Sequence, residues 1–349
     1  GKGRPLGVSP RFRTLSCRFT FPGKGGYAAM DVHAFQELQS RVFDLHAQGR
    51  FRDALEVAVL AAEKFPEKIA KTAYWMACLY SRLGETGKAL GILNDAVREG
   101  AWWSEAALLS DPDFEPVRNM AEFQAIVSEC KHLKDLAQVT ARPELLVFTP
   151  SESRCGQPPG GPPPLMITLH WRGGNAKDFA EYWREPALAA GVILALPQSS
   201  QVFAKDEFCW DNQDLAESEI PRAYAQLRAT CQFDAGQVIL AGASQGGRIA
   251  ISMALKGQAL PCRGFIAVVP AIRDFAALIP SIEGAARRGV KGYIVTGEKD
   301  QFLQGVKALH AEMANRGLPC ELLVEPKLGH QFPGDFPDIL ASAIDFVLR

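Results

Sequence analysis

Hydrophobic positions follow two different patterns, which change at about residue 140. From about residue 32 to 137, apolar residues recur at spacings of three and four without Val/Ile-rich alternation, which predicts a run of helices. Farther on, short and almost continuously hydrophobic runs alternate with helical patterns, as is typical of parallel strands covered on both faces. This alternation predicts an α/β domain with a doubly wound, mostly parallel sheet. The predicted strands are residues 145–150, 165–170, 192–197, 238–243, 265–270, 293–297 and 321–326.

These patterns predict an all-α domain over residues 30–140 and an α/β domain over residues 141–349. A basic extension, residues 1–29, precedes them; it has six basic and no acidic residues. A transit peptide for an organelle would explain this composition, and a start at Met30, after a non-native or upstream-translated segment, explains it equally well. The Pro/Gly-rich stretch 151–164 follows a predicted strand, so we expect a surface loop inside the second domain rather than an interdomain linker.

Two stretches of the helical region are alike at an offset of 35 residues. The matching positions are Gly49, Ala54 and Ala61 in the first stretch and Gly84, Ala89 and Ala96 in the second. With Phe51 and Pro66, the first stretch resembles a tetratricopeptide repeat, whereas no proline closes the second. Since such repeats usually need at least three units, we expect this region to pack against the domain that follows.

Charge and cysteine usage narrow the classes of partner. The chain has 38 Lys and Arg against 39 Asp and Glu, which favours neither nucleic acid nor an anionic membrane as a partner. No segment approaches the roughly 18 consecutive apolar residues of a membrane span. Eight cysteines are scattered without a C-x-x-C pair, which predicts reduced thiols, no metal site and a cytoplasmic location.

The strongest chemical signal is the segment GASQGG, residues 242–247, which follows a predicted strand and opens a predicted helix. This is the G-x-S-x-G nucleophile elbow in its strand–turn–helix context, with Ser244 as the nucleophile. Gly242 and Gly246 would remove clashes that side chains make in such a strained turn. The alternative is a chance glycine-rich turn.

A serine nucleophile needs a base and a carboxylate that orients the base. His330 lies in a loop directly after the last predicted strand, whereas His310 falls in a predicted helix. Asp300 follows a strand in the sequence GEKD and is preferred over the competing acids Glu298 and Asp274. The resulting order of Ser244, Asp300 and His330 is the order expected for α/β-hydrolases.

The segment LHWRGGN, residues 169–175, ends an early strand in a tight glycine turn, where a second oxyanion donor is needed. With these motifs, the chain from about residue 144 to its end resembles the phospholipase/carboxylesterase, dienelactone-hydrolase-like branch of the α/β-hydrolases. The resemblance implies backbone oxyanion donors at Arg172 and Gln245. Trp171 stands where the family often has glycine, so either residue 171 or residue 172 supplies the first amide. We interpret His170 as a structural residue that orients this loop.

The predicted loop QSSQVFAKDEFCWDNQD carries three aromatic residues, Phe203, Phe208 and Trp210, above the edge of the sheet. These residues are candidates for lining an acyl or alcohol pocket, and simple loop packing explains them equally well. No nucleotide-binding glycine motif and no metal-ligand spacing is present, so we expect no cofactor.

These observations favour a serine carboxylesterase that acts on a small-molecule ester of short to medium chain length. A thioesterase, peptidase or acyltransferase uses the same groups and stays open as an alternative. A second hypothesis makes the helical region a scaffold that binds a partner protein, with the hydrolase domain secondary. An intermediate possibility is that the helices cover the active site or form a contact between copies in a homo-oligomer.

Overall fold

The helical domain consists of helices that follow one another as antiparallel neighbours. The computed structural model describes residues 25–150, 161–258 and 260–349. Its first four α-helices are α1 (Gly25–Ala47), α2 (Phe51–Lys64), α3 (Ile69–Arg82) and α4 (Thr86–Arg98), and a short 3-10 helix, η1 (Pro66–Lys68), joins α2 to α3. Residues 1–24 of the predicted basic extension and residues 151–160 of the predicted loop lie outside the described residues. Residues 25–29, also assigned to that extension, instead begin α1.

The small residues of the two similar stretches occupy equivalent places in these helices. Gly49 and Gly84 end the turns after α1 and α3 with φ angles of 72° and 78°, a left-handed conformation that favours glycine. Ala54 and Ala61 of α2 and Ala89 of α4 are completely buried. The neighbouring helices therefore pack closely where the sequence repeats itself.

The helical domain ends in α5 (Glu105–Ser110), the 3-10 helix η2 (Pro112–Phe114) and the long helix α6 (Ala121–Thr140). Ser104 caps α5 by accepting a hydrogen bond from the N–H of Ala107, and Asp111 likewise accepts one from the N–H of Asp113. Helix α6 packs against α4 and α5 and then leads directly into the sheet of the second domain.

The second domain is built on a seven-stranded sheet with the order β1-β3-β2-β6-β7-β8-β9. Its strands are β1 (Glu144–Phe148), β2 (Leu165–Leu169), β3 (Ile193–Gln198), β6 (Val238–Ala243), β7 (Gly264–Val268), β8 (Lys291–Gly297) and β9 (Cys320–Glu325). Every pairing is parallel except that of the edge strand β1 with β3. The predicted doubly wound, mostly parallel sheet is thus confirmed, with all seven predicted strands present.

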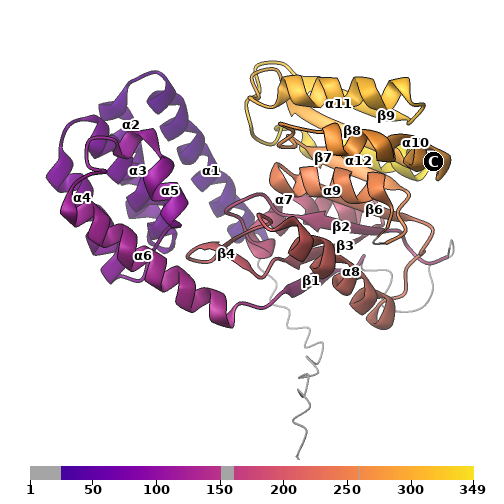
Figure 1. The fold of residues 1–349 in the computed structure, drawn as a ribbon, viewed down its shortest axis with the longest axis horizontal. Coiled ribbons are helices and arrows are strands. Elements are labelled where there is room, and N and C mark those ends of the chain that lie inside the picture. The colour runs from indigo at the N-terminus through magenta and orange to yellow at the C-terminus, as the bar shows by residue number, and fades with distance from the viewer. Residues whose placement is uncertain (1–24, 151–160, 259) are drawn as a thin grey trace, which may run out of the picture.

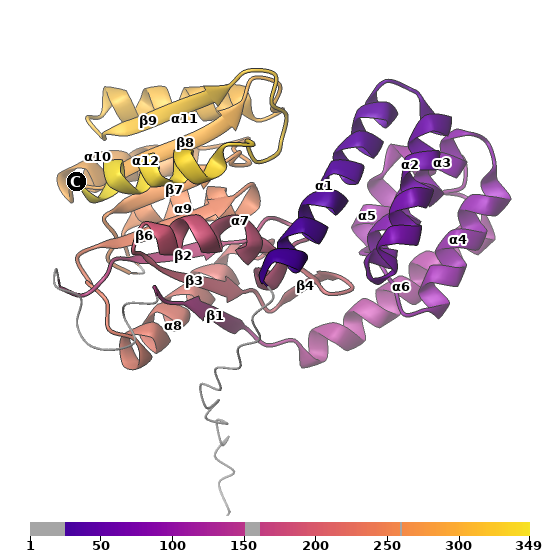
Figure 2. The same ribbon diagram turned by 180° about the vertical axis from the view of Figure 1, so that it is seen from behind.

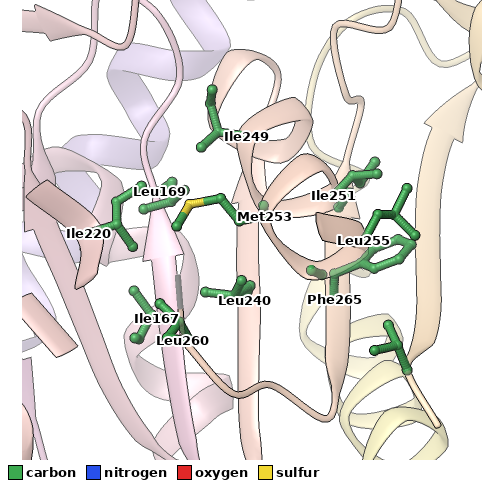
Figure 3. Close-up of a cluster of buried hydrophobic side chains, with 14 of the residues drawn as sticks. Ile167, Leu169, Ile220, Leu240, Ile249, Ile251, Met253, Leu255, Leu260 and Phe265 are labelled. Atoms are coloured by element: carbon green, nitrogen blue, oxygen red, sulfur yellow. The ribbon is translucent and has the colours of Figure 1, made fainter. Parts of the chain in front are cut away.

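Helices cover both faces of this sheet. One face packs against α8 (Gln213–Thr230), α9 (Gln245–Lys256), α10 (Ile279–Arg287) and α11 (Leu303–Asn315), with the 3-10 helix η4 (Ala276–Leu278) before α10. The other face packs against α7 (Ala176–Ala189) and α12 (Phe336–Leu348). Figure 3 shows the first of these cores, where Ile249 and Met253 of α9 lie over Leu169 and Leu240 of the central strands. Among the described residues, no helix combines the length and the apolar character needed to cross a membrane.

The prediction of a loop after β3 is wrong in part, because this segment contains a β-hairpin of β4 (Gln201–Ala204) and β5 (Glu207–Cys209). The hairpin extends from the carboxyl edge of the sheet toward the helical domain (Figure 1). There the N–H of Val202 donates to Gln138 Oε1 at 2.9 Å, and the N–H of Lys205 donates to the carbonyl of Trp102 at 3.1 Å. The two domains therefore meet at the edge where the parallel strands end.

Candidate active site

Ser244 is held in a strained turn between β6 and α9. Its φ and ψ angles are 52° and −115°, a backbone conformation that residues other than glycine rarely adopt. The N–H of Ser244 donates to the carbonyl of Val268 on the neighbouring strand at 2.9 Å, which fixes the turn. The turn places the serine at the carboxyl edge of the sheet, at the start of α9.

The two flanking glycines are required by close backbone contacts. A Cβ atom on Gly246 would lie 2.1 Å from the carbonyl oxygen of Leu169, and one on Gly242 would lie 2.6 Å from the backbone of Gly246. Both separations are far below any van der Waals contact. The strand, the turn and the helix can therefore pack together only with glycine on both sides of the serine.

The structure brings Ser244, His330 and Asp300 together in one hydrogen-bonded line, although they are far apart in the sequence. His330 Nε2 lies 2.8 Å from Ser244 Oγ, and His330 Nδ1 lies 3.0 and 3.1 Å from the two carboxylate oxygens of Asp300. The side chain of Asp300 is fully buried, and it accepts hydrogen bonds from the Thr296 hydroxyl at 3.2 Å and from the N–H of Phe302 at 2.9 Å. A buried, fully bonded carboxylate orients the imidazole so that Nε2 is free to accept the serine proton.

The competing residues have other partners. Glu298 accepts a hydrogen bond from the N–H of Lys327, and Asp274 accepts one from the N–H of Ala276 at the start of η4. His310 is hydrogen-bonded through Nε2 to the carbonyl of Cys320. Each of these side chains stabilises its own loop or helix, away from Ser244.

His170 has the surroundings of a structural residue. It is completely buried, its Nδ1 lies 2.8 Å from the carbonyl of Trp171, and its Nε2 lies 3.3 Å from Gln198 Nε2. Burial lowers the pKa of His170 to about 4, so the ring is neutral at physiological pH. With Nδ1 donating to the carbonyl of Trp171 and Nε2 accepting from Gln198, the ring holds the loop after β2 in place.

A network that the motifs did not predict connects this loop to the start of α9. Arg172 forms a two-pronged ion pair with Asp211, with both nitrogen–oxygen distances at 2.9 Å. Gln245 donates from Nε2 to Asp211 at 2.7 Å and accepts from the N–H of Trp210 at 2.8 Å. The hydrogen bonds from Arg172 hold the pKa of Asp211 below its ordinary value, so the pair stays charged. The only sequence signal was the cluster of polar residues around Trp210.

The backbone N–H groups of Trp171, Arg172 and Gln245 have no hydrogen-bond acceptor within the part of the chain that the structure describes. Gln245 is the first residue of α9, whose initial N–H groups have no partner within the helix. The Arg172–Asp211–Gln245 network links the two segments that carry these N–H groups. The segments can therefore present donors to the same oxygen atom.

The structure separates the three aromatic residues predicted to line a pocket. Trp210 is completely buried beneath the loop and donates from its indole N–H to the carbonyl of His170 at 3.0 Å, so its assignment to a pocket wall is wrong. Phe208 packs against the hydrophobic core of the helical domain. Phe203 lines a cavity, and its ring lies 4.5 Å from the guanidinium carbon of Arg172.

This cavity lies between the two domains and has a volume of about 300 Å³. The α/β domain contributes Trp171, Gly173, Phe203, Ala204 and Glu207 to its walls. The helical domain contributes residues of α3, of the segment before α5 and of α5 itself, among them Lys71, Tyr74, Trp75, Trp103, Ser104 and Ala107. Trp171 and Gly173 belong to the loop after β2, so the cavity reaches the segment that carries the candidate oxyanion donors Trp171 and Arg172.

One group of possible metal ligands occurs among the described residues, in the helical domain. Single ligand atoms of Cys78, Asp111 and Asp113 lie within 4.8 Å of one another. Asp111 already accepts from the hydroxyl of Tyr74 at 2.8 Å, and Asp113 lies 2.7 Å from His46 Nε2. These bonds tie α1, α3 and η2 together.

The sheet order, the glycine-flanked serine turn and the helices on both faces define an α/β-hydrolase fold preceded by an all-helical domain. Residues 34–138, which span most of the helical domain, match the protein family described as "A/B hydrolase-like, N-terminal domain".

Comparison with known proteins gives similar folds at low sequence identity. A crystal structure of an uncharacterized protein from Bacillus cereus is 24% identical, covers 89% of this chain and 97% of its own, and has a TM-score of 0.51. This likeness shows a common fold over both domains. The S-formylglutathione hydrolase FrmB from Staphylococcus aureus is 15% identical, covers 59% of this chain and 93% of its own, and has a TM-score of 0.45.

One curated relative matches a shorter part of the chain. A chloroplastic protein from Arabidopsis thaliana is 30% identical over 83 residues, which are 23% of this chain and 24% of the relative. The match thus spans about a quarter of the relative's length.

Proposed function

We propose that this chain is a serine hydrolase that cleaves carboxylic esters of short to medium chain length through an acyl-enzyme. The observation that carries the proposal is the line of hydrogen bonds from Ser244 Oγ through His330 to the buried Asp300. A serine within reach of an imidazole that a buried carboxylate orients is the arrangement that activates a hydroxyl as a nucleophile.

In the first half of the reaction, Ser244 Oγ forms a bond to the ester carbonyl carbon while its proton passes to His330 Nε2. The carbonyl oxygen becomes an oxyanion, which the N–H of Gln245 and the N–H of Trp171 or Arg172 stabilise. The bond from the carbonyl carbon to the alcohol oxygen then breaks, and His330 returns the proton to the departing alcohol. The products of this half are the free alcohol and an acylated Ser244.

In the second half, His330 takes a proton from a water molecule, whose oxygen attacks the acyl carbon. The tetrahedral intermediate collapses, the bond to Ser244 Oγ breaks, and Ser244 recovers the proton from His330 while the carboxylic acid leaves. A thioester or an amide would react by the same steps, so the alternatives differ in the leaving group and not in the residues.

The structure favours this enzymatic role over that of a protein-binding scaffold. The helical domain contributes Lys71, Tyr74 and Trp103 to a cavity whose opposite wall includes Trp171, a candidate oxyanion donor. The helices thus supply part of the surroundings in which a substrate would lie. This arrangement supports the idea that they restrict which substrates reach Ser244.

The test is hydrolysis of a series of p-nitrophenyl esters, from acetate to palmitate, together with labelling by a fluorophosphonate and mass spectrometry. We expect the wild type to cleave the shorter esters and to carry the label on Ser244, and Ser244→Ala to lose both properties. The variant Ser342→Ala changes an exposed serine on α12 and serves as the matched control. A folded wild type that neither hydrolyses any ester nor takes up the label would disprove the proposal.

A further inference from the structure

The interdomain cavity has flat, preformed aromatic walls on the side of the helical domain. The rings of Tyr74 and Trp103 are 5.9 Å apart between centroids. The hydroxyl of Tyr74 is bonded to Asp111 at 2.8 Å, and the indole N–H of Trp103 donates to the carbonyl of Ala70 at 2.8 Å. Because the polar atoms of both rings already have partners inside the helical domain, the rings offer apolar surface to the cavity.

The opposite wall belongs to the α/β domain and to the loop next to the elbow. Phe203 is fixed against the guanidinium of Arg172, which is itself bonded to Asp211. Trp171 packs edge-on against Phe179 and Tyr182, with ring centroids 4.9 and 5.4 Å apart. A flat group in the cavity would therefore lie between aromatic surfaces and next to the loop that carries the N–H groups of Trp171 and Arg172.

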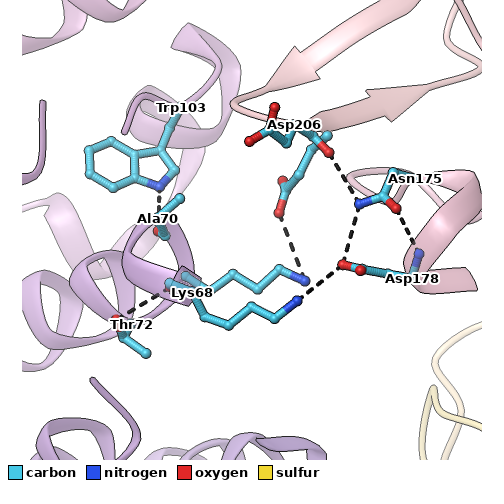
Figure 4. Close-up of polar contacts among 9 residues, drawn as sticks. Lys68, Ala70, Thr72, Trp103, Asn175, Asp178 and Asp206 are labelled. Atoms are coloured by element: carbon cyan, nitrogen blue, oxygen red, sulfur yellow. Dashed lines mark hydrogen bonds and ion pairs between the residues drawn. The ribbon is translucent and has the colours of Figure 1, made fainter. Parts of the chain in front are cut away.

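A single charged pair, Lys71 and Glu207, gives the cavity a polar end. Lys71 Nζ lies 3.9 Å from Glu207 Oε1, which is longer than a hydrogen bond, so both groups keep bonding capacity for a third partner. The neighbouring pair differs, because Lys68 Nζ and Asp178 Oδ2 are within 3.3 Å and the same carboxylate accepts from Asn175 (Figure 4).

The surroundings of Glu207 are unfavourable for an isolated carboxylate. Its side chain is only 19% exposed. Burial raises its pKa from the ordinary value to about 7, Lys71 and Lys68 oppose this rise, and Asp178 and Asp206 add to it. A ligand that donates a hydrogen bond would stabilise the charged form, which the cavity does not stabilise by itself.

We propose that this cavity binds the ring of a hydroxyaryl ester, with the ring between the aromatic walls and its hydroxyl between Lys71 and Glu207. A phenolic hydroxyl can donate to the carboxylate and accept from the ammonium group at the same time, which an alkyl chain or an unsubstituted ring cannot do. The volume of about 300 Å³ suits one ring with a short linker, at the lower end of the range of small-molecule sites. This inference rests on the proposed ester hydrolysis and names its substrate class.

The first experiment compares methyl 3-(4-hydroxyphenyl)propionate with methyl 3-phenylpropionate, and 4-hydroxyphenethyl acetate with phenethyl acetate. The two pairs place the ring in the acyl part and in the alcohol part. We expect kcat/KM for the hydroxylated member of at least one pair to be about tenfold higher or more, the effect of a hydrogen bond to a charged group. Equal values within both pairs would overturn the proposal while leaving ester hydrolysis intact.

Variants locate the effect in the cavity. Glu207→Gln should bring the ratio between the hydroxylated and the plain ester close to one, chiefly through KM, whereas Glu185→Gln, an exposed carboxylate on α7, should leave the ratio unchanged. Ala107→Phe should remove the preference for aromatic esters because the new ring occupies the cavity. If Lys71 and Glu207 only clamp the domains together, Glu207→Gln will not change the ratio, and the proposal fails.

A binding measurement separates this proposal from the proposed chemistry. Ser244→Ala is titrated separately with methyl 3-(4-hydroxyphenyl)propionate and with 4-hydroxyphenethyl acetate, and binding is followed by tryptophan fluorescence. If Ser244→Ala binds the ester and the additional substitution Ala107→Phe abolishes this binding, the site is supported. Absence of hydrolysis by the wild type would in that case disprove only the reaction. Hydrolysis of p-nitrophenyl butyrate without any binding of hydroxyaryl esters would disprove only the site.

Discussion

The carboxyl group of Glu207 should make the stability of this protein depend on pH. Burial raises its pKa from 4.5 to about 7, so the folded state binds this proton more tightly than the unfolded chain does. A group of this kind contributes stability that is fully present below the unfolded pKa and is lost as the pH rises through the folded pKa. The loss should therefore extend from about pH 4.5 to just above pH 7.

The magnitude follows from the size of the rise. A difference of this size between the folded and the unfolded pKa corresponds to roughly 3 kcal/mol, of which about 2.5 kcal/mol falls between pH 5 and pH 8. Glutamine keeps the shape of the side chain and removes the charge. We therefore expect Glu207→Gln to gain about 2 kcal/mol in free energy of unfolding, relative to the wild type, when the pH changes from 5 to 8.

The assay is urea unfolding followed by tryptophan fluorescence at pH 5 and pH 8, with wild type, Glu207→Gln and the exposed control Glu185→Gln. The control should follow the wild type at both pH values, because its carboxylate is in water in both states. If the difference between Glu207→Gln and the wild type is the same at the two pH values, the carboxylate is not buried as the structure has it and the reasoning is refuted.

Three further predictions concern the candidate active site. Asp300→Asn should lower kcat about 10⁴-fold in a folded protein, because an amide no longer holds the imidazole in the tautomer whose Nε2 accepts the serine proton; Glu298→Gln, the competing acid, should stay near wild-type activity in the same ester assay. Gly246→Ala should lower the free energy of unfolding by more than about 2 kcal/mol, since its Cβ would lie 2.1 Å from a carbonyl oxygen. Gly91→Ala on α4, where a Cβ meets nothing within 4 Å, should not lower the free energy of unfolding in the same unfolding experiment. Asp211→Asn should reduce kcat about tenfold in a protein that stays folded at the assay temperature, by loosening the N–H donors; unchanged kcat would exclude this role.

Much of the α/β domain could be predicted because its signals are local. A central parallel strand is hydrophobic on both faces, so the central strands of the sheet are visible as short apolar runs. The elbow around Ser244 could be recognised from the local order of strand, turn and helix. The atoms that exclude side chains at Gly242 and Gly246 nevertheless include the carbonyl oxygen of Leu169, which lies on the neighbouring strand β2. Because the base and the acid must lie in loops at the carboxyl edge of the sheet, they could be assigned to the loops that carry His330 and Asp300.

The parts that the sequence did not predict depend on contacts between distant segments. The hairpin at 201–209 is a two-stranded unit whose outer residues are fixed by the helical domain, so its strands lack a clear hydrophobic pattern of their own. Trp210 resembled a pocket residue because its burial comes from the loop after β2 and not from its sequence neighbours. The tetratricopeptide resemblance, self-association and a cytoplasmic location stay predictions.

The hairpin also explains why neither domain alone reveals how substrates would be selected. Val202 and Lys205 attach it to α6 and to the segment before α5, and Phe203, between them, lines the cavity. Figure 2 shows from behind that α1 and the hairpin lie where the two domains meet. Docking of the helical domain and the shape of the cavity therefore depend on the same few residues.

Because the helical domain supplies the aromatic wall and Lys71 while the hairpin supplies Phe203 and Glu207, the proposed subsite exists only when the domains are docked. A change in substrate preference in this protein is accordingly expected to involve the interface between the domains, while the elbow and its partners stay the same.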